Sequence, residues 1–334
     1  MSHKNIALFV AHAGCQNTCS FCNQRIISGK TETATADDVK RAMDIALASG
    51  CHDGQLAFFG GSFTAVEREY MISLLEAARP YVLDRSITGI RISTRPDAID
   101  DEILEILKYY GVEAIELGAQ SMDERVLSLN RRGHTAEDVR YASRLIKEYG
   151  FELGLQMMTG LYGDTDEGAV YTAKEIIKLS PATVRIYPTV VLLGTELSRL
   201  YRAGEYVPET LDEAVDLCSV LLDMFEKAGI KVIRLGLHSG GNVEDGYVAG
   251  AYHPAFRELC ESKLFYERVL EDLSKYDNSE KKEYKIFVNP KEISKMTGQN
   301  RINIVKLRDK NYFCKVFPDE KLEKNEFYTE VSTK

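Results

Sequence analysis

The chain has 334 residues, of which 44% are hydrophobic and 28% charged, and its formal net charge at pH 7 is −9. This composition is ordinary for a soluble globular protein with room for one large domain and a small one. No run approaches the roughly 18 apolar residues of a membrane span and nothing resembles a targeting segment, so we expect a cytoplasmic chain with no membrane partner. Seven cysteines, an odd number at low density, argue against a disulfide framework.

The charge is distributed unevenly along the chain. Residues 281–334 hold 13 Lys and Arg against 8 Asp and Glu, a net of +5, which leaves a net of −14 for residues 1–280. A basic tail on an acidic body indicates a polyanionic partner, although a merely solvated tail explains the charge equally well.

Three closely spaced cysteines follow the first strand-like run, residues 6–10. Cys15, Cys19 and Cys22 have the spacing C-x4-C-x2-C, and no fourth cysteine is nearby. A structural zinc site uses four protein ligands, whereas a 4Fe-4S cluster held by three thiolates leaves one iron open for a ligand that is not a protein side chain. The spacing therefore favours a 4Fe-4S cluster.

A zinc site is the alternative for these cysteines, because C-x2-C pairs often bind zinc. Its fourth ligand would be His12 or Cys51. Cys218, Cys260 and Cys314 are scattered along the chain, and we expect them to be core or surface thiols.

Strand-like runs alternate with amphipathic segments of helical length as far as residue 235. The expected strands are 6–10, 55–59, 89–93, 114–117, 152–158 and 184–187, with a possible seventh at 231–235. The expected helices are 36–49, 67–78, 100–110, 136–149, 168–179 and 211–228, and Thr35 with Asp38 predicts a capping box before the first. This alternation predicts parallel strands joined by crossover helices. Six or seven units fit a partial, open (β/α)6 barrel better than a small doubly wound sheet or a full eight-fold barrel.

Polar groups follow each of the first six expected strands, at the point where the strand ends. The segments are 15–22, 60–62, 93–97, 118–121 with 130–134, 159–165, and 187–189. Because functional groups of such barrels lie at the carboxyl ends of the strands, we expect these segments to surround one site. Taken singly, each is also explained as a turn or a helix cap.

The motifs CQNTCSFC, FFGGSFTA, STRPD, LGAQSMDERVLSLNRRGHT, GLQMMTGL and IYPTVVLLGTEL stand in this order in the chain. Together they resemble the radical-SAM core of the Elongator catalytic subunit and its bacterial and archaeal relatives, over roughly residues 5–240. The series is similar, more distantly, to the oxygen-independent coproporphyrinogen oxidase group. The resemblance implies a partial TIM barrel that holds a 4Fe-4S cluster and S-adenosylmethionine.

The resemblance also implies roles for the matching residues. Cys15, Cys19 and Cys22 match the cluster ligands. The residues that match the S-adenosylmethionine site are Gly60, Gly61 and Ser62 at the methionyl amine, Thr94 and Arg95 near the cofactor, Gln120 beside the ribose, and Arg131 or Arg132 near the methionyl carboxylate. Tyr187 matches a tyrosine facing the reaction chamber, and Gln156 falls where the coproporphyrinogen oxidase group carries a ribose-binding aspartate. For each polar residue, an ordinary cap or strand-end hydrogen bond is the alternative.

The implied chemistry is reductive cleavage of S-adenosylmethionine to methionine and a 5′-deoxyadenosyl radical that abstracts a substrate hydrogen. A low-potential electron donor of the flavodoxin or ferredoxin type is an implied partner. Two features differ from the Elongator subunit: only about 90 residues follow the core, too few for its acetyltransferase domain, and no basic extension precedes Cys15. These differences argue against acetyl-CoA-dependent carboxymethylation of tRNA wobble uridine.

The basic tail predicts a small α+β domain. A strand at 284–288, short helices at 293–296 and 302–307, and a strand at 312–317 resemble a minimal KH module, which clamps a nucleic-acid backbone over a GxxG loop. The corresponding loop residues are Gly298, Gln299, Asn300 and Arg301, so the second glycine is replaced. RNA binding by this loop is one reading, and a small cap that packs on the barrel is the other.

These observations divide the chain into a core at 1–240, a bridging loop and helix at 241–280, and a basic domain at 281–334. His238 and His253 lie in glycine-rich loops of the bridge, where ordinary loop hydrogen bonding is expected of them. Three hypotheses follow: a radical-SAM enzyme that modifies tRNA or another RNA, a radical-SAM enzyme with a small-molecule substrate, and a non-catalytic protein that binds zinc and RNA.

Overall fold

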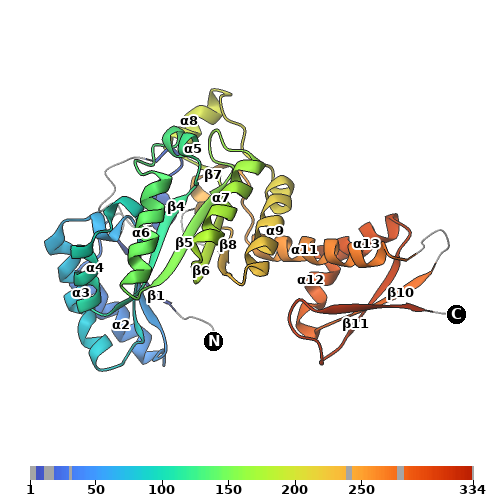
Figure 1. Cartoon of the computed structure of the whole chain (residues 1–334), viewed down its shortest axis with the longest axis horizontal. Helices are drawn as coiled ribbons and strands as arrows, with labels where there is room; N and C mark the ends of the chain where they lie inside the picture. Colours follow the sequence, from blue (N-terminus) through green and yellow to red (C-terminus); the bar gives the residue numbers. More distant parts are fainter. Residues whose placement is uncertain (1–4, 11–18, 30–31, 238–242, 277–281, 333–334) are drawn as a thin grey trace. The chain divides into compact units, whose positions relative to one another are not determined.

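The computed structural model describes residues 5–10, 19–29, 32–237, 243–276 and 282–332 (Figure 1). The chain falls into two compact units, one formed by Met1–Thr210 with Phe225–Tyr252 and the other by Leu211–Met224 with His253–Lys334. The domain boundaries expected at residues 240 and 280 remain predictions. Among the described residues, none of the helices combines the length and the hydropathy that crossing a bilayer requires.

The first unit is built on a curled, seven-stranded parallel sheet in which every strand pairs with the next one along the chain. Its strands are β1 (Asn5–Val10), β2 (Gln55–Gly60), β3 (Gly89–Thr94), β4 (Val112–Gln120), β5 (Glu152–Thr159), β6 (Thr183–Pro188) and β8 (Lys231–Leu235). All seven expected strands are therefore present, and the partial (β/α)6 barrel is confirmed, with the seventh strand closing the series.

Helices connect the parallel strands (Figure 1). Those that pack against strands of the sheet are α2 (Ala36–Ala48), α3 (Arg68–Leu83), α4 (Asp101–Tyr109), α6 (Ala136–Glu148) and α7 (Asp166–Leu179), and α9 (Leu211–Lys227) precedes β8 in the chain. The capping box at Thr35 and Asp38 is confirmed, and Thr135 forms a second one with Asp138. Because such caps satisfy otherwise unpaired N–H groups, they fix where each helix begins.

Several short elements after the strands were not expected from the sequence. They are α1 (Gln24–Ser28), η1 (Phe63–Ala65), η2 (Pro96–Ala98), α5 (Glu124–Leu129), β7 (Val190–Leu192), α8 (Glu196–Arg202), α10 (Val243–Gly246) and β9 (Tyr247–Gly250). β9 ends at Gly250 and pairs with β7 in an antiparallel ladder, and His253 follows it in a loop, as expected. Four-residue strands that pair with a distant partner leave no periodic signal in the sequence.

A buried set of charged side chains lies on one face of the sheet. Arg91 on β3 donates hydrogen bonds to Gln55 on β2 at 2.9 Å, Glu116 on β4 at 3.2 Å and Glu152 on β5 at 2.7 Å. Arg185 on β6 donates two hydrogen bonds to the same Glu116, at 2.6 and 2.9 Å. Arg91 alternates along β3 with the buried Ile90 and Ile92, so this polar set faces away from the apolar layer under the helices.

The second unit is a small α+β domain, as expected. It contains α11 (Phe256–Leu273), β10 (Glu283–Val288), η3 (Pro290–Glu292), α12 (Ile293–Thr297), η4 (Gln299–Arg301), α13 (Ile302–Asp309), β11 (Phe313–Pro318) and β12 (Phe327–Ser332). β10 pairs with β11 in parallel, as a strand–helix–helix–strand connection permits, and with β12 in antiparallel. β12 was not expected.

One apolar core holds the second unit together. Side chains of α11, among them Phe265 and Val269, pack with Tyr284 and Ile286 of β10 and with Met296 of α12.

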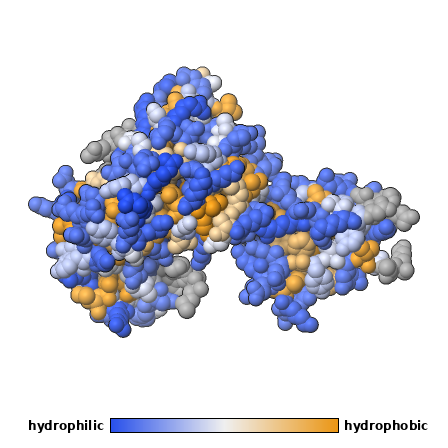
Figure 2. Space-filling model, viewed as in Figure 1, coloured by the Kyte–Doolittle hydropathy of each residue, from blue (hydrophilic) through white to orange (hydrophobic). Residues whose placement is uncertain are grey.

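The surface visible in Figure 2 is largely hydrophilic, with hydrophobic side chains gathered in patches on each unit. The Cys260 thiol on α11 and the Cys314 thiol on β11 are buried, which raises the pKa of Cys260 far above its ordinary value and that of Cys314 to about 12. Both therefore stay neutral core thiols, as expected.

Candidate cofactor site

Ser20, which lies between Cys19 and Cys22 in the sequence, fixes the segment that carries these two cysteines. The Ser20 hydroxyl donates to Asn130 Oδ1 at 2.6 Å, its N–H donates to the Asn130 carbonyl at 3.2 Å, and its own carbonyl accepts from the N–H of Leu197 at 2.7 Å. Ser20 is 0% exposed. The cysteine segment is thereby held between the end of α5 and the first turn of α8.

Asn130 extends this anchor to the loop after β5. Its side-chain amide donates to the carbonyls of Val126 at 2.8 Å and Tyr162 at 2.9 Å, while its oxygen accepts from Ser20. Sequence reasoning did not single out Ser20 or Asn130 for this role. The only signal was their place in polar segments after strands, because hydrogen bonds between residues 110 positions apart leave no local pattern.

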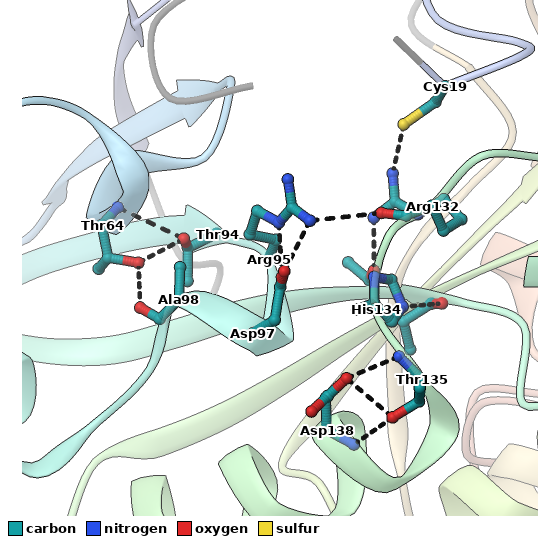
Figure 3. A network of polar contacts seen from close by, with 12 residues as sticks. Cys19, Thr64, Thr94, Arg95, Asp97, Ala98, Arg132, His134, Thr135 and Asp138 are labelled. Carbon is teal, nitrogen blue, oxygen red and sulfur yellow. Dashed lines mark hydrogen bonds and ion pairs between the residues drawn. The ribbon is translucent and has the colours of Figure 1, made fainter. Parts of the chain in front are cut away.

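Of the three closely spaced cysteines, the structure describes Cys19 and Cys22. Each of these two sulfurs accepts a hydrogen bond from a side chain that also bonds to the end of a sheet strand. Arg132 donates from Nη1 to Cys19 Sγ at 3.0 Å and from Nη2 to the carbonyl of Gly118 on β4 at 2.9 Å (Figure 3). Gln24 donates from Nε2 to Cys22 Sγ at 3.4 Å and to the carbonyl of Gly60 on β2 at 3.2 Å. Cys15 lies outside the described residues.

The two candidate arginines at 131 and 132 point to different places. Arg132 is half-buried, its guanidinium lies 5.9 Å from the centre of the Phe21 ring, and no described residue forms a hydrogen bond with its buried Nε. Arg131 has a left-handed backbone with φ of 53° and an exposed side chain that pairs with Glu196 of α8 at 3.4 Å. Of these two arginines, Arg132 is therefore the one that contacts a cysteine sulfur, that of Cys19.

The glycine pair after β2 has a clear local cause. Gly60 has φ of +110°, and a Cβ there would lie 3.3 Å from the carbonyl oxygen of Val10, the last residue of β1. The N–H of Gly61 donates to that same oxygen at 3.1 Å. Close backbone approach between β1 and β2 thus accounts for Gly60. Ser62, which follows, is buried at 7% exposure.

Thr94 and Arg95 at the end of β3 both bond to neighbouring protein groups (Figure 3). The hydroxyls of Thr94 and Thr64 lie 2.6 Å apart, and Thr64 Oγ1 donates to the carbonyl of Ala98 at 2.6 Å. Arg95 pairs with Asp97 through two hydrogen bonds at 2.5 and 2.6 Å, the bidentate geometry expected of a guanidinium and a carboxylate. Arg95 Nη2 also lies 3.5 Å from the carbonyl of Arg132, which joins this pair to the cysteine segment.

The structure brings together the two candidate glutamines. Gln156 on β5 donates from Nε2 to Oε1 of Gln120 on β4 at 3.2 Å. Gln120 is 5% exposed and has φ of 64° at a register shift between β4 and β5. A Cβ on Gly118 would lie 2.9 Å from the Gln120 amide nitrogen, so that glycine leaves room for the side chain.

Tyr187 on β6 joins the buried charged set. The phenol and the Arg185 guanidinium form a side-chain hydrogen bond. Burial by itself lowers the pKa of Arg185, but the adjacent Glu116 carboxylate outweighs it and holds the pKa above the ordinary value. Arg185 therefore presents a fixed positive charge to Tyr187.

His134 stands behind Arg132 at the end of β4. It is 4% exposed, its Nε2 lies 3.2 Å from the carbonyl of Ala119, and its Nδ1 has no hydrogen-bond partner within the described part of the chain. Burial, reinforced by the positive charge of Arg132, lowers the pKa of His134 to about 4. The imidazole is therefore neutral at physiological pH.

The described donor set suits an iron–sulfur cluster. Cys19 and Cys22 are free, half-buried cysteines whose sulfurs accept N–H hydrogen bonds, as the sulfur ligands of iron–sulfur clusters do. Cys51 cannot complete a zinc site with them, because it precedes β2 whereas Cys22 is tied to Gly60 at the far end of that six-residue strand, about 20 Å away. Within the described ranges no three His, Cys, Asp or Glu side chains form a metal site. Cys15 as the third ligand remains a prediction.

Comparison with protein families gives two matches. The model of the Radical SAM superfamily matches residues 10–176, and the model of the Radical_SAM C-terminal domain matches residues 181–265. Both matched ranges begin at or near strands of the parallel sheet, β1 and β6.

Curated relatives match part of their own length. The tRNA uridine(34) acetyltransferase of Methanocaldococcus jannaschii is 30% identical over 193 residues, which is 52% of this chain and 36% of that protein. Elongator complex protein 3 of Schizosaccharomyces pombe is 30% identical over 184 residues, 49% of this chain and 34% of that protein. The chain thus spans about a third of the length of these relatives.

Among solved structures, archaeal Elp3 from Methanocaldococcus infernus aligns with a TM-score of 0.63 and 22% identity, over 83% of this chain and 64% of that one. Streptococcus suis SuiB aligns with a TM-score of 0.51 and 16% identity, over 72% of this chain and 50% of that one. These likenesses concern the fold alone.

Proposed function

The chain belongs to the radical SAM superfamily and is an enzyme, and from that premise we propose that it reductively cleaves S-adenosylmethionine at a 4Fe-4S cluster in order to modify RNA, with tRNA as the favoured substrate class. The observation that carries the proposal is the placement of the cysteine sulfurs. Cys19 and Cys22 are held at the carboxyl ends of β4 and β2 by Arg132 and Gln24. In barrels of this kind, that edge of the sheet carries the chemistry.

Three cysteines would hold the cluster: Cys15, Cys19 and Cys22. When bound, the cluster and S-adenosylmethionine supply the one-electron cleavage that yields methionine and a 5′-deoxyadenosyl radical. The protein's own residues bind, orient and shield. The buried Arg132 Nε has no hydrogen-bond partner among the described residues, which supports a contact of this side chain with the methionyl carboxylate.

The remaining site residues would position the nucleoside part of the cofactor and the substrate. The Gln120–Gln156 pair offers a buried amide hydrogen-bonding edge for ribose hydroxyls. Tyr187, fixed by Arg185, is proposed to face the reaction chamber. Gly60, Gly61, Ser62, Thr94 and Arg95 would line the adjoining strand ends and shape the site. Gly61 bonds through its backbone N–H to Val10, whereas Thr94 and Arg95 bond through their side chains to Thr64 and Asp97.

The substrate class rests on the relatives. Proteins named tRNA uridine(34) acetyltransferase and Elongator complex protein 3 match about half of this chain. Residues 281–334 carry a net charge of +5, and Gln299, Asn300 and Arg301 are exposed between α12 and α13, which supports a nucleic-acid substrate. The low-potential electron donor of the flavodoxin or ferredoxin type and a cytoplasmic location belong to the same proposal.

A small-molecule substrate is the second candidate, and one observation favours it. Gly298 is buried, and a Cβ there would lie 2.9 Å from Ile302 Cγ2 and 3.1 Å from Ser262 Oγ. The glycine is thus explained by packing inside the second unit, without any close approach of a nucleic-acid backbone. The hypothesis of a non-catalytic protein is wrong, because the chain belongs to an enzyme superfamily. His12, the other candidate zinc ligand, lies outside the described residues.

The testing experiment measures 5′-deoxyadenosine formed by anaerobically reconstituted, dithionite-reduced protein, with and without bulk tRNA. Strong stimulation by tRNA supports the RNA-modifying enzyme. Product formation that ignores tRNA supports the small-molecule candidate. Absence of product with an intact cluster under both conditions would contradict the proposed cleavage.

A further inference from the structure

We propose that Arg132 and Gln24 are positioning residues that orient the cluster-binding sulfurs and set the reduction potential of the cluster. This inference rests on the proposed function, because it presumes that Cys19 and Cys22 bind a cluster. The inference gives Arg132 a second role, besides its proposed contact with the methionyl carboxylate. It also gives a role to Gln24, a residue for which the resemblance to the Elongator subunit implies none.

The geometry of the two residues is parallel. Arg132 joins Cys19 Sγ to the carbonyl of Gly118, and Gln24 joins Cys22 Sγ to the carbonyl of Gly60. Each side chain therefore fixes one sulfur against the end of a different sheet strand. Since β2 and β4 belong to one hydrogen-bonded sheet, both sulfurs are held in position relative to that sheet.

Both side chains are themselves well supported. The Arg132 carbonyl lies within hydrogen-bond reach of Arg95, at 3.5 Å, and its guanidinium packs over Phe21. Gln24 belongs to α1, whose start is capped by the side chain of Asn23 accepting from the N–H of Ile26. Because other contacts fix each donor side chain in place, its hydrogen bond restrains the position of the cysteine sulfur.

The electrostatic consequence has a definite sign. An iron–sulfur cluster becomes more negative on reduction, so N–H donors and positive charge at its sulfurs stabilise the reduced form and raise the reduction potential. Arg132 contributes both a donor and a full charge, half-buried where solvent screens it less. Gln24 contributes a donor only. Arg132 should therefore have the larger effect.

The test is an EPR-monitored redox titration of the anaerobically reconstituted full chain in the absence of S-adenosylmethionine, with iron and sulfide measured on the same samples. At the wild-type midpoint potential, Arg132→Gln is expected to lower the ratio of reduced to oxidised cluster about tenfold, equivalent to about 59 mV for a one-electron couple. Gln24→Leu is expected to lower it about threefold, since it removes a hydrogen bond and no charge.

Two further variants separate charge from contact. Arg132→Lys keeps the charge and is expected to lose less than Arg132→Gln. Arg131→Gln is the matched control: it removes the same charge one residue away, from a side chain that is 57% exposed and paired with Glu196, and the ratio should stay within twofold of the wild type.

The outcomes distinguish the inference from its premise. If Arg132→Gln and Gln24→Leu carry four irons and titrate like the wild type, the inference is overturned and the proposed function stands. Loss of the cluster in Arg132→Gln but not in Arg131→Gln supports the positioning role directly. A wild-type chain that assembles no cluster overturns both the inference and the proposed function.

Discussion

Ser20 and Asn130 are joined twice, hydroxyl to side-chain oxygen at 2.6 Å and backbone to backbone at 3.2 Å, although 110 residues separate them. Through this pair the cysteine segment, which follows the first strand, is tied to the end of α5, which follows the fourth. The segment that carries Cys19 and Cys22 is thus held in place by hydrogen bonds to distant parts of the chain.

Replacement of Asn130 by Ala should destabilise the first unit. The change leaves the buried Ser20 hydroxyl without its side-chain acceptor and the carbonyl of Tyr162 without its donor, whereas the carbonyl of Val126 keeps the backbone N–H of residue 130. Each unsatisfied buried polar group costs about 1–3 kcal/mol, so we expect a loss of roughly 2–4 kcal/mol in the free energy of unfolding. Denaturant titration followed by circular dichroism measures it. Ser128→Ala, at an exposed residue of α5, is the control.

Replacement of Cys19 by Ala should abolish cluster assembly, because two thiolates cannot hold a four-iron cluster against exchange. Iron analysis and the absorption spectrum after anaerobic reconstitution measure the outcome. Cys51→Ala, which changes a thiol before β2, should retain the full iron complement. A full complement of iron in the Cys19 variant would overturn the ligand assignment.

The buried carboxylate of Glu116 should be essential to the stability of the barrel. Glu116 accepts hydrogen bonds from both Arg91 and Arg185 and is 4% exposed. Glu116→Leu leaves two buried guanidinium groups short of a counter-charge, a change that costs about 3–5 kcal/mol. Thermal and denaturant unfolding test this. Glu137→Gln, at a side chain 77% exposed, should stay within about 0.5 kcal/mol of the wild type. Equal stability of the Glu116 variant and that control would contradict the prediction.

His134 should make the folded state less stable as the pH falls. Its pKa is about 4 in the folded chain, lowered by burial and by Arg132 despite the opposing effects of the Ala119 carbonyl and Asp97, whereas an unfolded histidine titrates near 6.5. Between these values the unfolded chain binds a proton that the folded chain does not. Stability from the neutral imidazole is therefore complete above pH 6.5 and is lost as the pH falls to 4, by at most about 3 kcal/mol.

The measurement is the difference in unfolding free energy between wild type and His134→Gln at several pH values. The difference should shrink from pH 7 to pH 4. Asp164, whose pKa burial raises to about 6, changes stability in the opposite direction over part of this range, but it is common to both proteins and cancels in the difference. A difference that does not vary with pH would contradict the prediction.

If the loop between α12 and α13 contacts RNA, Arg301→Gln should weaken retention of tRNA severalfold. Arg301 is exposed with a left-handed backbone of φ 60°, and the loss of one phosphate contact should reduce the salt dependence of binding by about one unit of slope. Filter binding at several salt concentrations tests this. The control is Lys321→Gln, which removes an exposed charge from the turn between β11 and β12. Equal retention by both variants and the wild type would favour the small-molecule substrate.

The amino-acid sequence determined much of this protein by itself. Alternation of apolar runs and amphipathic segments gave all seven parallel strands and the connecting helices, because strand and helix periodicities are local properties. The spacing of Cys15, Cys19 and Cys22 and the residues after each strand gave the family and its candidate cofactors. The capping box at Thr35 was equally local, since its two partners lie three residues apart.

Only the tertiary structure decided how those residues act. It placed Arg132 on the Cys19 sulfur and turned Arg131 toward Glu196, although the two are adjacent and chemically identical. It paired Gln156 with Gln120, and it revealed Ser20 and Asn130 as the anchor of the cysteine segment. The physical reason is that these contacts join residues 36 to 113 positions apart, so they exist only after parallel strands bring their carboxyl ends to one edge of the sheet.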